Sequence, residues 1–137
     1  MVYQSAANSI VPEPAKRRRV LLVDDSPEFL VSATRFLSQL PWIEVVAYAS
    51  SGIIGINQVA LVHPDVVLMD LNMPGMNGLE ATRQIKAQRN PPCVILVTLS
   101  DSHEYRLAAA EAKADGFITK SDFGSHIAQL LDKHCNR

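Results

Sequence analysis

Residues 66–78 read VVLMDLNMPGMNG, an apolar run that ends in Asp70 and passes into a turn rich in Met, Pro and Gly. A short run that is apolar at every position fits a strand covered on both faces, as strands of parallel sheets are. Three more apolar runs also end in polar residues: 20–23 before Asp24 and Asp25, 93–97 before Thr98, and 116–119 before Lys120. A functional site formed by polar side chains is therefore expected where the buried strands end.

Each strand is followed by a stretch with helical spacing, so that strand and helix alternate five times. The predicted strands are 20–23, 44–49, 66–69, 93–97 and 116–119, and the predicted helices end near residue 40, near residue 62, and span 79–88, 103–112 and 122–133. Ser26 and Ser51 are predicted N-caps, and the predicted helix that follows Ser51 carries Ile53, Ile56 and Ala60. The alternation predicts an α/β fold with a parallel sheet and helices on both faces.

The composition indicates a single soluble domain. The 137 residues are 47% apolar with a net charge of −1, which gives no general attraction to nucleic acid or acidic membranes. No apolar stretch approaches the length of a membrane span, so a cytoplasmic protein is predicted. Cys93 and Cys135 show neither a disulfide framework nor metal-ligand spacing, which favours a reducing compartment. Residues 1–18 are interpreted as a flexible N-terminal leader and 19–134 as the domain.

The polar residues at the strand ends predict a phosphoryl-transfer site. Because strands of an open parallel sheet end at one crevice, Asp24, Asp25, Asp70, Thr98 and Lys120 are expected to meet there. Three carboxylates repel one another without a cation, and Mg²⁺ prefers carboxylate, carbonyl and water oxygens. A metal-neutralised aspartate can attack phosphorus, and lysine can offset the charge of the phosphoryl oxygens. A threonine hydroxyl can bond to a phosphoryl group only once that group is present, which suits a switch.

At these residues the chain resembles the receiver domain of two-component response regulators. The resemblance rests on the order and spacing of four segments: 22–26 (LVDDS), 68–78 (LMDLNMPGMNG), 97–98 (VT) and 114–120 (ADGFITK). It covers about residues 19–133 and implies a flavodoxin-like, doubly wound (βα)5 fold with strand order 2-1-3-4-5. It is closest in character to the receivers of helix-turn-helix regulators.

The resemblance also implies roles for individual residues. Asp70 would accept a phosphoryl group from a histidine kinase or a phosphotransfer protein. Asp25, Asp70 and the backbone carbonyl of Asn72 would hold Mg²⁺, with Asp24 joining through water, and Lys120 would contact the phosphoryl group. The domain would be a signalling switch, with no independent substrate turnover.

The signal would leave through one face of the domain. Thr98 would move toward the phosphoryl group, and Phe117, at the family's aromatic switch position, would turn inward in response. The readout surface would be helix 103–112, strand 116–119 and helix 122–133, which could also join two copies as a homodimer. No membrane contact is expected, and contact with nucleic acid is expected only if a DNA-binding domain exists outside this chain.

Five residues depart from the family pattern. Phe117 lacks the hydroxyl of tyrosine, so its rotamer switch is expected to be steric rather than hydrogen-bonded. Ser121 follows Lys120 where the family usually has proline, so this peptide bond is predicted to be trans. Leu99 is bulkier than the common alanine and is expected to narrow access to Asp70. Lys113 stands where glycine often ends the helix, in a left-handed position, and Asn77 replaces a frequent aspartate in the turn.

Two other functions compete with the switch. A phosphohydrolase acting through an aspartyl-phosphate usually has a second aspartate two residues after the nucleophile, where this chain has Asn72. A flavodoxin-like cofactor binder needs a phosphate-cradling loop after the first strand, where Asp24 and Asp25 would repel phosphate without a metal. The sequence leaves open whether the chain is a stand-alone receiver or the receiver portion of a longer regulator.

Overall fold

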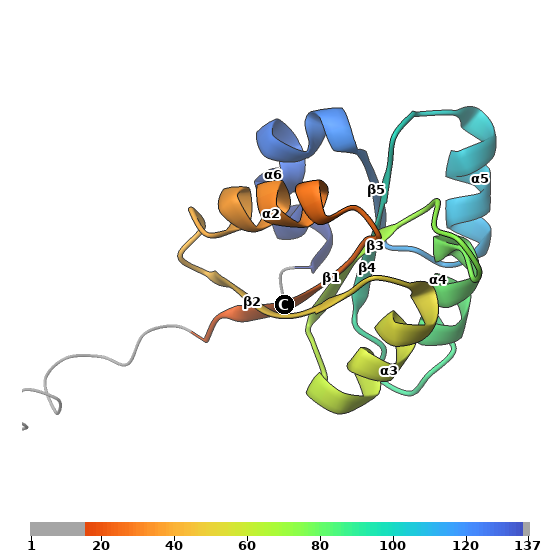
Figure 1. Ribbon diagram of the computed structural model, residues 1–137, viewed down its shortest axis with the longest axis horizontal. Coiled ribbons are helices and arrows are strands. Elements are labelled where there is room, and N and C mark those ends of the chain that lie inside the picture. Colours follow the sequence, from red (N-terminus) through yellow and green to blue (C-terminus); the bar gives the residue numbers. More distant parts are fainter. Residues whose placement is uncertain (1–15, 136–137) are drawn as a thin grey trace, which may run out of the picture.

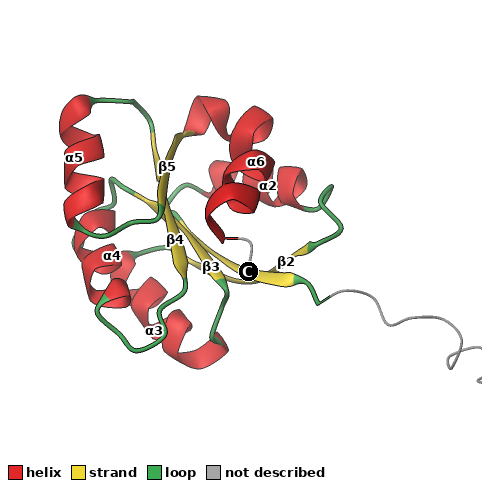
Figure 2. Cartoon of the chain, turned by 180° about the vertical axis from the view of Figure 1, so that it is seen from behind, coloured by secondary structure: helices red, strands yellow, loops and turns green. Residues whose placement is uncertain are grey.

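The computed structural model describes residues 16–135, which form a five-stranded parallel sheet with helices on both faces (Figures 1 and 2). The strands are β1 (Arg18–Val23), β2 (Ile43–Ala49), β3 (Val66–Asp70), β4 (Cys93–Thr98) and β5 (Gly116–Thr119). The helices are α2 (Pro27–Leu37), α3 (Gly52–Val62), α4 (Gly78–Lys86), α5 (His103–Glu111) and α6 (Phe123–Cys135), with a 3-10 turn η1 (Lys120–Asp122). The strand order is β2-β1-β3-β4-β5, so the predicted fold class and order are confirmed.

The sheet separates two apolar layers. Helices α2 and α6 cover one face, and α3, α4 and α5 cover the other (Figure 1). Along β1, Val20 and Leu22 pack into the first layer, whereas Leu21 and Val23 pack into the second. Because successive side chains of a strand point to opposite faces, a strand covered on both sides must be apolar throughout, as the sequence predicted.

Serine side chains begin the helices where the sequence predicted. Ser26 Oγ accepts the Phe29 N–H at 3.3 Å, and Ser51 Oγ accepts the Ile54 N–H at 3.2 Å. These bonds satisfy amide groups that have no partner within the first turn of a helix. Helix α2 ends at Leu37, slightly before the predicted end near residue 40.

The apolar side chains of α3 do not all face the core. Ile56 is half-buried, but Ile53 is 57% exposed and Ala60 is also exposed. Almost every residue of this helix is apolar, so the pattern does not single out one face. The sheet is approached instead by Gly55, where an added Cβ would lie 3.1 Å from Val23 Cγ2. Because Gly55 has no side chain, this face of α3 can pack closely against the sheet.

The interpretation of the two cysteines as unpaired is also wrong. Cys93 and Cys135 form a disulfide, with their Cα atoms 5.6 Å apart although 42 positions separate them in the sequence. Cys93 begins β4, and Cys135 is the last residue of α6. Strand β5 carries the chain to the carboxyl edge of the sheet, and α6 returns it to the amino edge where β4 begins (Figure 2).

The described residues bear on two further expectations. None of their helices has the length and apolarity that spanning a bilayer requires. The predicted leader, 1–18, falls outside the described residues except for 16–18, and Arg18 already pairs with Ile43 in the sheet.

Candidate functional site

The acidic residues gather at the carboxyl edge of the sheet, at the point where the strand order reverses. Asp24 follows β1 and Asp70 ends β3, and these neighbouring strands are aligned so that Val23 lies opposite Met69. Together with Asp25, they offer carboxylate oxygens that all lie within 4.8 Å of one another. Asp24 and Asp70 are buried, at 2% and 4% exposure, whereas Asp25 is exposed. A reversal of this kind is where open α/β sheets bind ligands, and here it forms an acidic pocket.

Lys120 brings a positive charge to the pocket from the end of β5. Its Nζ lies 2.9 Å from Asp24 Oδ2 and 3.8 Å from Asp70 Oδ1. The same ammonium lies 4.6 Å from the centroid of the Phe29 ring, which in turn packs edge-on against Phe123 at 5.2 Å. A cation over an aromatic face is attracted to it, so Phe29 helps to position Lys120. No local signal in the sequence distinguishes this role of Phe29.

The Asp70 carboxyl is hard to ionise in the absence of a bound cation. Its pKa is raised from 3.8 to about 7, first because burial disfavours the charged form and second because the Asp24 carboxylate repels it. The Lys120 ammonium and a hydrogen bond from the Asn72 backbone N–H lower the pKa, and Asp25 raises it further. Asp70 is therefore only partly ionised near neutral pH.

The oxygen donors in the pocket fit a hard divalent cation. Asp24 Oδ1 accepts the Ser26 backbone N–H at 2.8 Å. The buried Oδ2 of Asp24 accepts no hydrogen bond from the described residues, and its polar contact among them is the ion pair with Lys120. Clustered carboxylate oxygens are the preferred ligands of hard cations such as Mg²⁺, and a bound cation would relieve the repulsion among the three aspartates.

The turn after Asp70 folds back tightly over the end of β3. The Gly78 N–H donates to the Leu71 carbonyl at 2.9 Å, and a Cβ at Gly78 would overlap the Asp70 carbonyl oxygen. Asn77 caps α4 by accepting the Glu80 N–H at 2.9 Å, which explains why asparagine replaces aspartate here without loss of the helix start. The turn can approach Asp70 this closely only because position 78 is glycine.

The two predicted switch residues lie on neighbouring strands. Thr98, at the end of β4, is fully buried and pairs with Thr119 of β5. Phe117 is half-buried on β5, and the Arg106 guanidinium lies 5.0 Å from the centroid of its ring. Arg106 is itself paired with Asp101, at 2.7 Å. The aromatic ring is therefore covered by a charged side chain of α5.

The departures from the family pattern have defined structures. No described residue has a cis peptide bond, so the bond between Lys120 and Ser121 is trans as predicted, and it enters η1. Lys113 has a φ of 68°, the predicted left-handed conformation. The Leu99 side chain is 74% exposed, and its effect on access to Asp70 stays a prediction.

Removing the charge of Lys120 should destabilise the metal-free domain. In Lys120→Met the buried Asp24 carboxylate loses its counter-ion, so we expect the free energy of unfolding to fall by roughly 1–2 kcal/mol. Urea unfolding in buffer with a chelator measures the change, and Mg²⁺ should restore part of the loss. Lys133→Met, on the exposed side of α6, is the control and should unfold as the unmodified chain does. Equal stability of the two variants would contradict the role of Lys120 as a counter-ion.

Comparisons with known proteins agree on one family. The family model described as the response regulator receiver domain matches residues 20–132. The chain is 36% identical over 113 residues to the transcriptional regulatory protein LiaR of Bacillus subtilis, covering 82% of this chain and 54% of that protein. It is 36% identical over 108 residues to the nitrate/nitrite response regulator protein NarL of Escherichia coli, covering 79% of this chain and 49% of that protein.

Solved structures give the same result. The crystal structure of a two-component response regulator of the LuxR family from an Aurantimonas species aligns with a TM-score of 0.81 at 31% identity, covering 86% of this chain and 84% of that chain. The response regulator domain of CheB from Thermotoga maritima aligns with a TM-score of 0.77 at 31% identity, covering 86% of this chain and 93% of that chain. The chain spans about half the length of the curated relatives LiaR and NarL.

Proposed function

The chain belongs to the response regulator receiver domain family and is a phosphorylation-controlled switch of a two-component system; from this premise we propose that Asp70 is its phosphoacceptor. The observation that carries the assignment is that Asp70 is the buried carboxylate lying within reach of two further aspartates and of Lys120. A phosphohydrolase is not favoured, because the position of its second acid is occupied by Asn72.

The metal site uses the oxygens that surround Asp70. Asp25, Asp70 and the Asn72 carbonyl would hold Mg²⁺, with Asp24 joining through water. The cation would supply positive charge that offsets the negative charge of the carboxylates and of the phosphoryl oxygens. With that charge present, Asp70, whose pKa is raised in the metal-free pocket, would be ionised at neutral pH and could act as a nucleophile.

Transfer of the phosphoryl group exchanges one bond for another. An Asp70 carboxylate oxygen attacks phosphorus as the bond from phosphorus to the phosphohistidine nitrogen of the donor breaks, and the electron pair returns to that nitrogen. Lys120, which now pairs with Asp24 at 2.9 Å, lies 3.8 Å from Asp70 Oδ1. Its ammonium is close enough to Asp70 to stabilise negative charge on a phosphoryl group bonded there.

The phosphoryl group changes the domain through Thr98 and Phe117. The Thr98 hydroxyl donates a hydrogen bond to the phosphoryl group, a contact that exists only in the modified state and so favours a second conformation. Phe117 turns inward as Thr98 moves, which withdraws its ring from Arg106. Helix α5 can follow, since its one fully buried residue is Ala109 and few large side chains anchor it.

The output face comprises α5, β5 and α6. A hollow of about 480 Å³ lies on this face, with Phe117 and Gly116 of β5 between side chains of α5 and α6. We assign to this face the contact with a downstream partner, including a second copy of the chain in a homodimer. The upstream partner is a histidine kinase or a phosphotransfer protein, and the compartment is the cytoplasm. Contact with nucleic acid would require a DNA-binding domain outside this chain.

Beryllofluoride, a mimic of the phosphoryl group, tests this assignment. With Mg²⁺ it should saturate the unmodified chain and shift the NMR amide signals of Thr98, Phe117 and α5, whereas Asp70→Asn should show no such shifts. Rapid turnover of a small phosphoester would favour the hydrolase instead. Shifts that persist unchanged in Asp70→Asn would remove Asp70 from its assigned role.

A further inference from the structure

The disulfide joins the output face to the sheet at the edge opposite Asp70. Cys93 opens β4, whereas Thr98, near Asp70, closes the same strand. The segment from Cys93 to Cys135, with a sequence separation of 42, contains the whole of α5, β5 and α6. A covalent bond between these two residues therefore closes a loop around every element of the output face.

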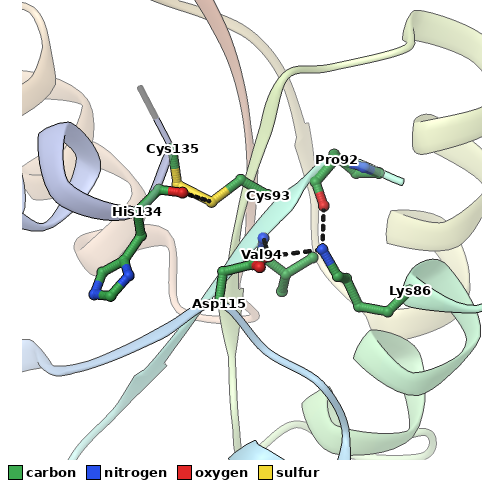
Figure 3. A network of polar contacts seen from close by, with 7 residues as sticks. All are labelled: Lys86, Pro92, Cys93, Val94, Asp115, His134 and Cys135. Atoms are coloured by element: carbon green, nitrogen blue, oxygen red, sulfur yellow. Dashed lines mark hydrogen bonds and ion pairs between the residues drawn. A yellow bond between two sulfur atoms is a disulfide. The ribbon is translucent and has the colours of Figure 1, made fainter. Parts of the chain in front are cut away.

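Cys93 is held in place on both sides by polar contacts that do not involve its sulfur (Figure 3). Asp115 Oδ2 accepts the Val94 N–H at 2.8 Å and the Lys86 ammonium at 2.7 Å, and Lys86 Nζ also donates to the Pro92 carbonyl at 3.0 Å. The residues immediately before and after Cys93 are thus fixed to α4 and to the start of β5. Because none of these contacts uses the sulfur, we expect Cys93 to keep its position when the disulfide is reduced.

Cys135 is the movable partner. It is the last residue of α6, where helices open most readily. Its side chain is only 5% exposed and belongs to the apolar core cluster of the α2 and α6 layer. A thiol packs in such a cluster as a small apolar side chain, so the reduced domain has no buried polar group to compensate and stays folded.

The disulfide lies beside a cavity at the protein surface. Both cysteines line a surface cavity of about 320 Å³, which is also lined by Arg18, Lys86, Asp115 and His134. Cys93 is half-buried, and its Sγ lies 3.5 Å from the His134 carbonyl oxygen. A structural disulfide sealed in a core offers no such entry, whereas thiol–disulfide exchange needs access to one sulfur.

We infer that Cys93 and Cys135 form a reversible redox clasp that fastens α6 to β4 and stabilises the output face when oxidised. The oxidant is a low-molecular-weight disulfide such as oxidised glutathione. One cysteine thiolate attacks it, which forms a mixed disulfide and releases one small thiol. The second cysteine attacks the mixed disulfide, which closes the Cys93–Cys135 bond and releases the second small thiol, so that the two protons lost by the cysteines end on the two products.

The clasp is expected to act on stability and on local opening. Cross-linking across a loop of this length restricts the unfolded chain, so the oxidised domain should melt roughly 10 °C above the reduced domain. Hydrogen exchange in the last turn of α6 should slow on oxidation because local opening of the helix end is suppressed, whereas exchange in β1 and β3, which open only on global unfolding, should slow only as far as the global stability rises. The consequence for signalling rests on the proposed function, because α6 forms part of the output face only if that assignment holds.

The test uses the unmodified chain in glutathione buffers of graded composition. Alkylation followed by mass spectrometry should show two reactive thiols under reducing conditions and none under oxidising conditions, with the oxidised chain lighter by two hydrogen atoms. The conversion should be reversible without unfolding. Cys93→Ser and Cys135→Ser should melt at one temperature in both buffers and should show no redox-dependent exchange in α6.

Three results would overturn the clasp: two free thiols at every glutathione ratio, a disulfide that is reduced only after unfolding, or a bond that joins two chains instead of one. None of these readouts involves Asp70. Loss of the beryllofluoride response in both redox forms would therefore refute the proposed function and leave the clasp to be judged by its thiols and melting temperature.

Discussion

In buffer without divalent cations at about pH 8, Asp70→Asn is expected to raise the free energy of unfolding by about 2–4 kcal/mol. The cause is the raised pKa of Asp70, which burial and the Asp24 carboxylate move from 3.8 to about 7. The folded domain must accommodate a charged carboxylate that the unfolded chain carries freely. An amide of nearly the same shape removes that requirement.

The pH dependence has a defined sign. An acid whose pKa is higher in the folded state binds its proton more tightly there, so the Asp70 contribution to stability falls as pH rises from about 4 to about 7 and is constant above. The stability difference between Asp70→Asn and the unmodified chain should grow over the same range. Urea unfolding at a series of pH values measures it. Asp25→Asn, which removes an exposed charge from the same site, should give a smaller gain.

At about pH 8, Mg²⁺ should make the unmodified chain more stable than Asp70→Asn. A ligand that binds only the folded state stabilises that state. The unmodified chain should gain stability with Mg²⁺ concentration, whereas Asp70→Asn should gain much less. If Asp70→Asn were no more stable than the unmodified chain in the chelator, the electrostatic account of the pocket would be wrong.

Gly78→Ala should cost about 3 kcal/mol or more, because the new Cβ cannot fit without movement of backbone. That Cβ would overlap the Asp70 carbonyl oxygen and lie 3.0 Å from Leu71 Cα. The turn would have to open, which would displace Asp70 as well as destabilise the fold. We expect a lower melting temperature and weaker Mg²⁺ binding in the same variant.

Gly75→Ala is the matched control in the same turn. Gly75 has a φ of 79° with open space around its Cα, so alanine there meets no neighbour and is disfavoured only by its backbone conformation. We expect a loss of about 1 kcal/mol with Mg²⁺ binding largely kept. Equal losses at Gly75 and Gly78 would show that close approach to Asp70 is not what requires glycine.

The alternation of strands and helices along the chain could be predicted, because a strand that is covered on both faces must be apolar throughout. Asp24, Asp70 and Lys120 could be placed together for the same reason, since one rule about strand ends applies to all of them. The inward face of α3 could not be predicted, because its apolar residues surround the helix and Gly55 decides the packing.

Contacts that depend on how the helices pack against the sheet could not be predicted either. The Cys93–Cys135 bond exists because α6 runs back to the amino edge, a path that the spacing of cysteines does not encode. The position of Phe29 beside the Lys120 ammonium depends on where α2 lies relative to η1. Both are consequences of tertiary packing between elements far apart in the chain.

The assignment of Asp70 is tested most directly by locating the phosphoryl group itself. The unmodified chain is incubated with acetyl phosphate and Mg²⁺, and the product is reduced with borohydride, which converts a phosphorylated aspartate into homoserine. Peptide mapping by mass spectrometry should then find homoserine at position 70, with none formed when Mg²⁺ is omitted or in Asp70→Asn. Homoserine at another aspartate, or equal phosphoryl incorporation in Asp70→Asn, would contradict the assignment of Asp70 as the phosphoacceptor.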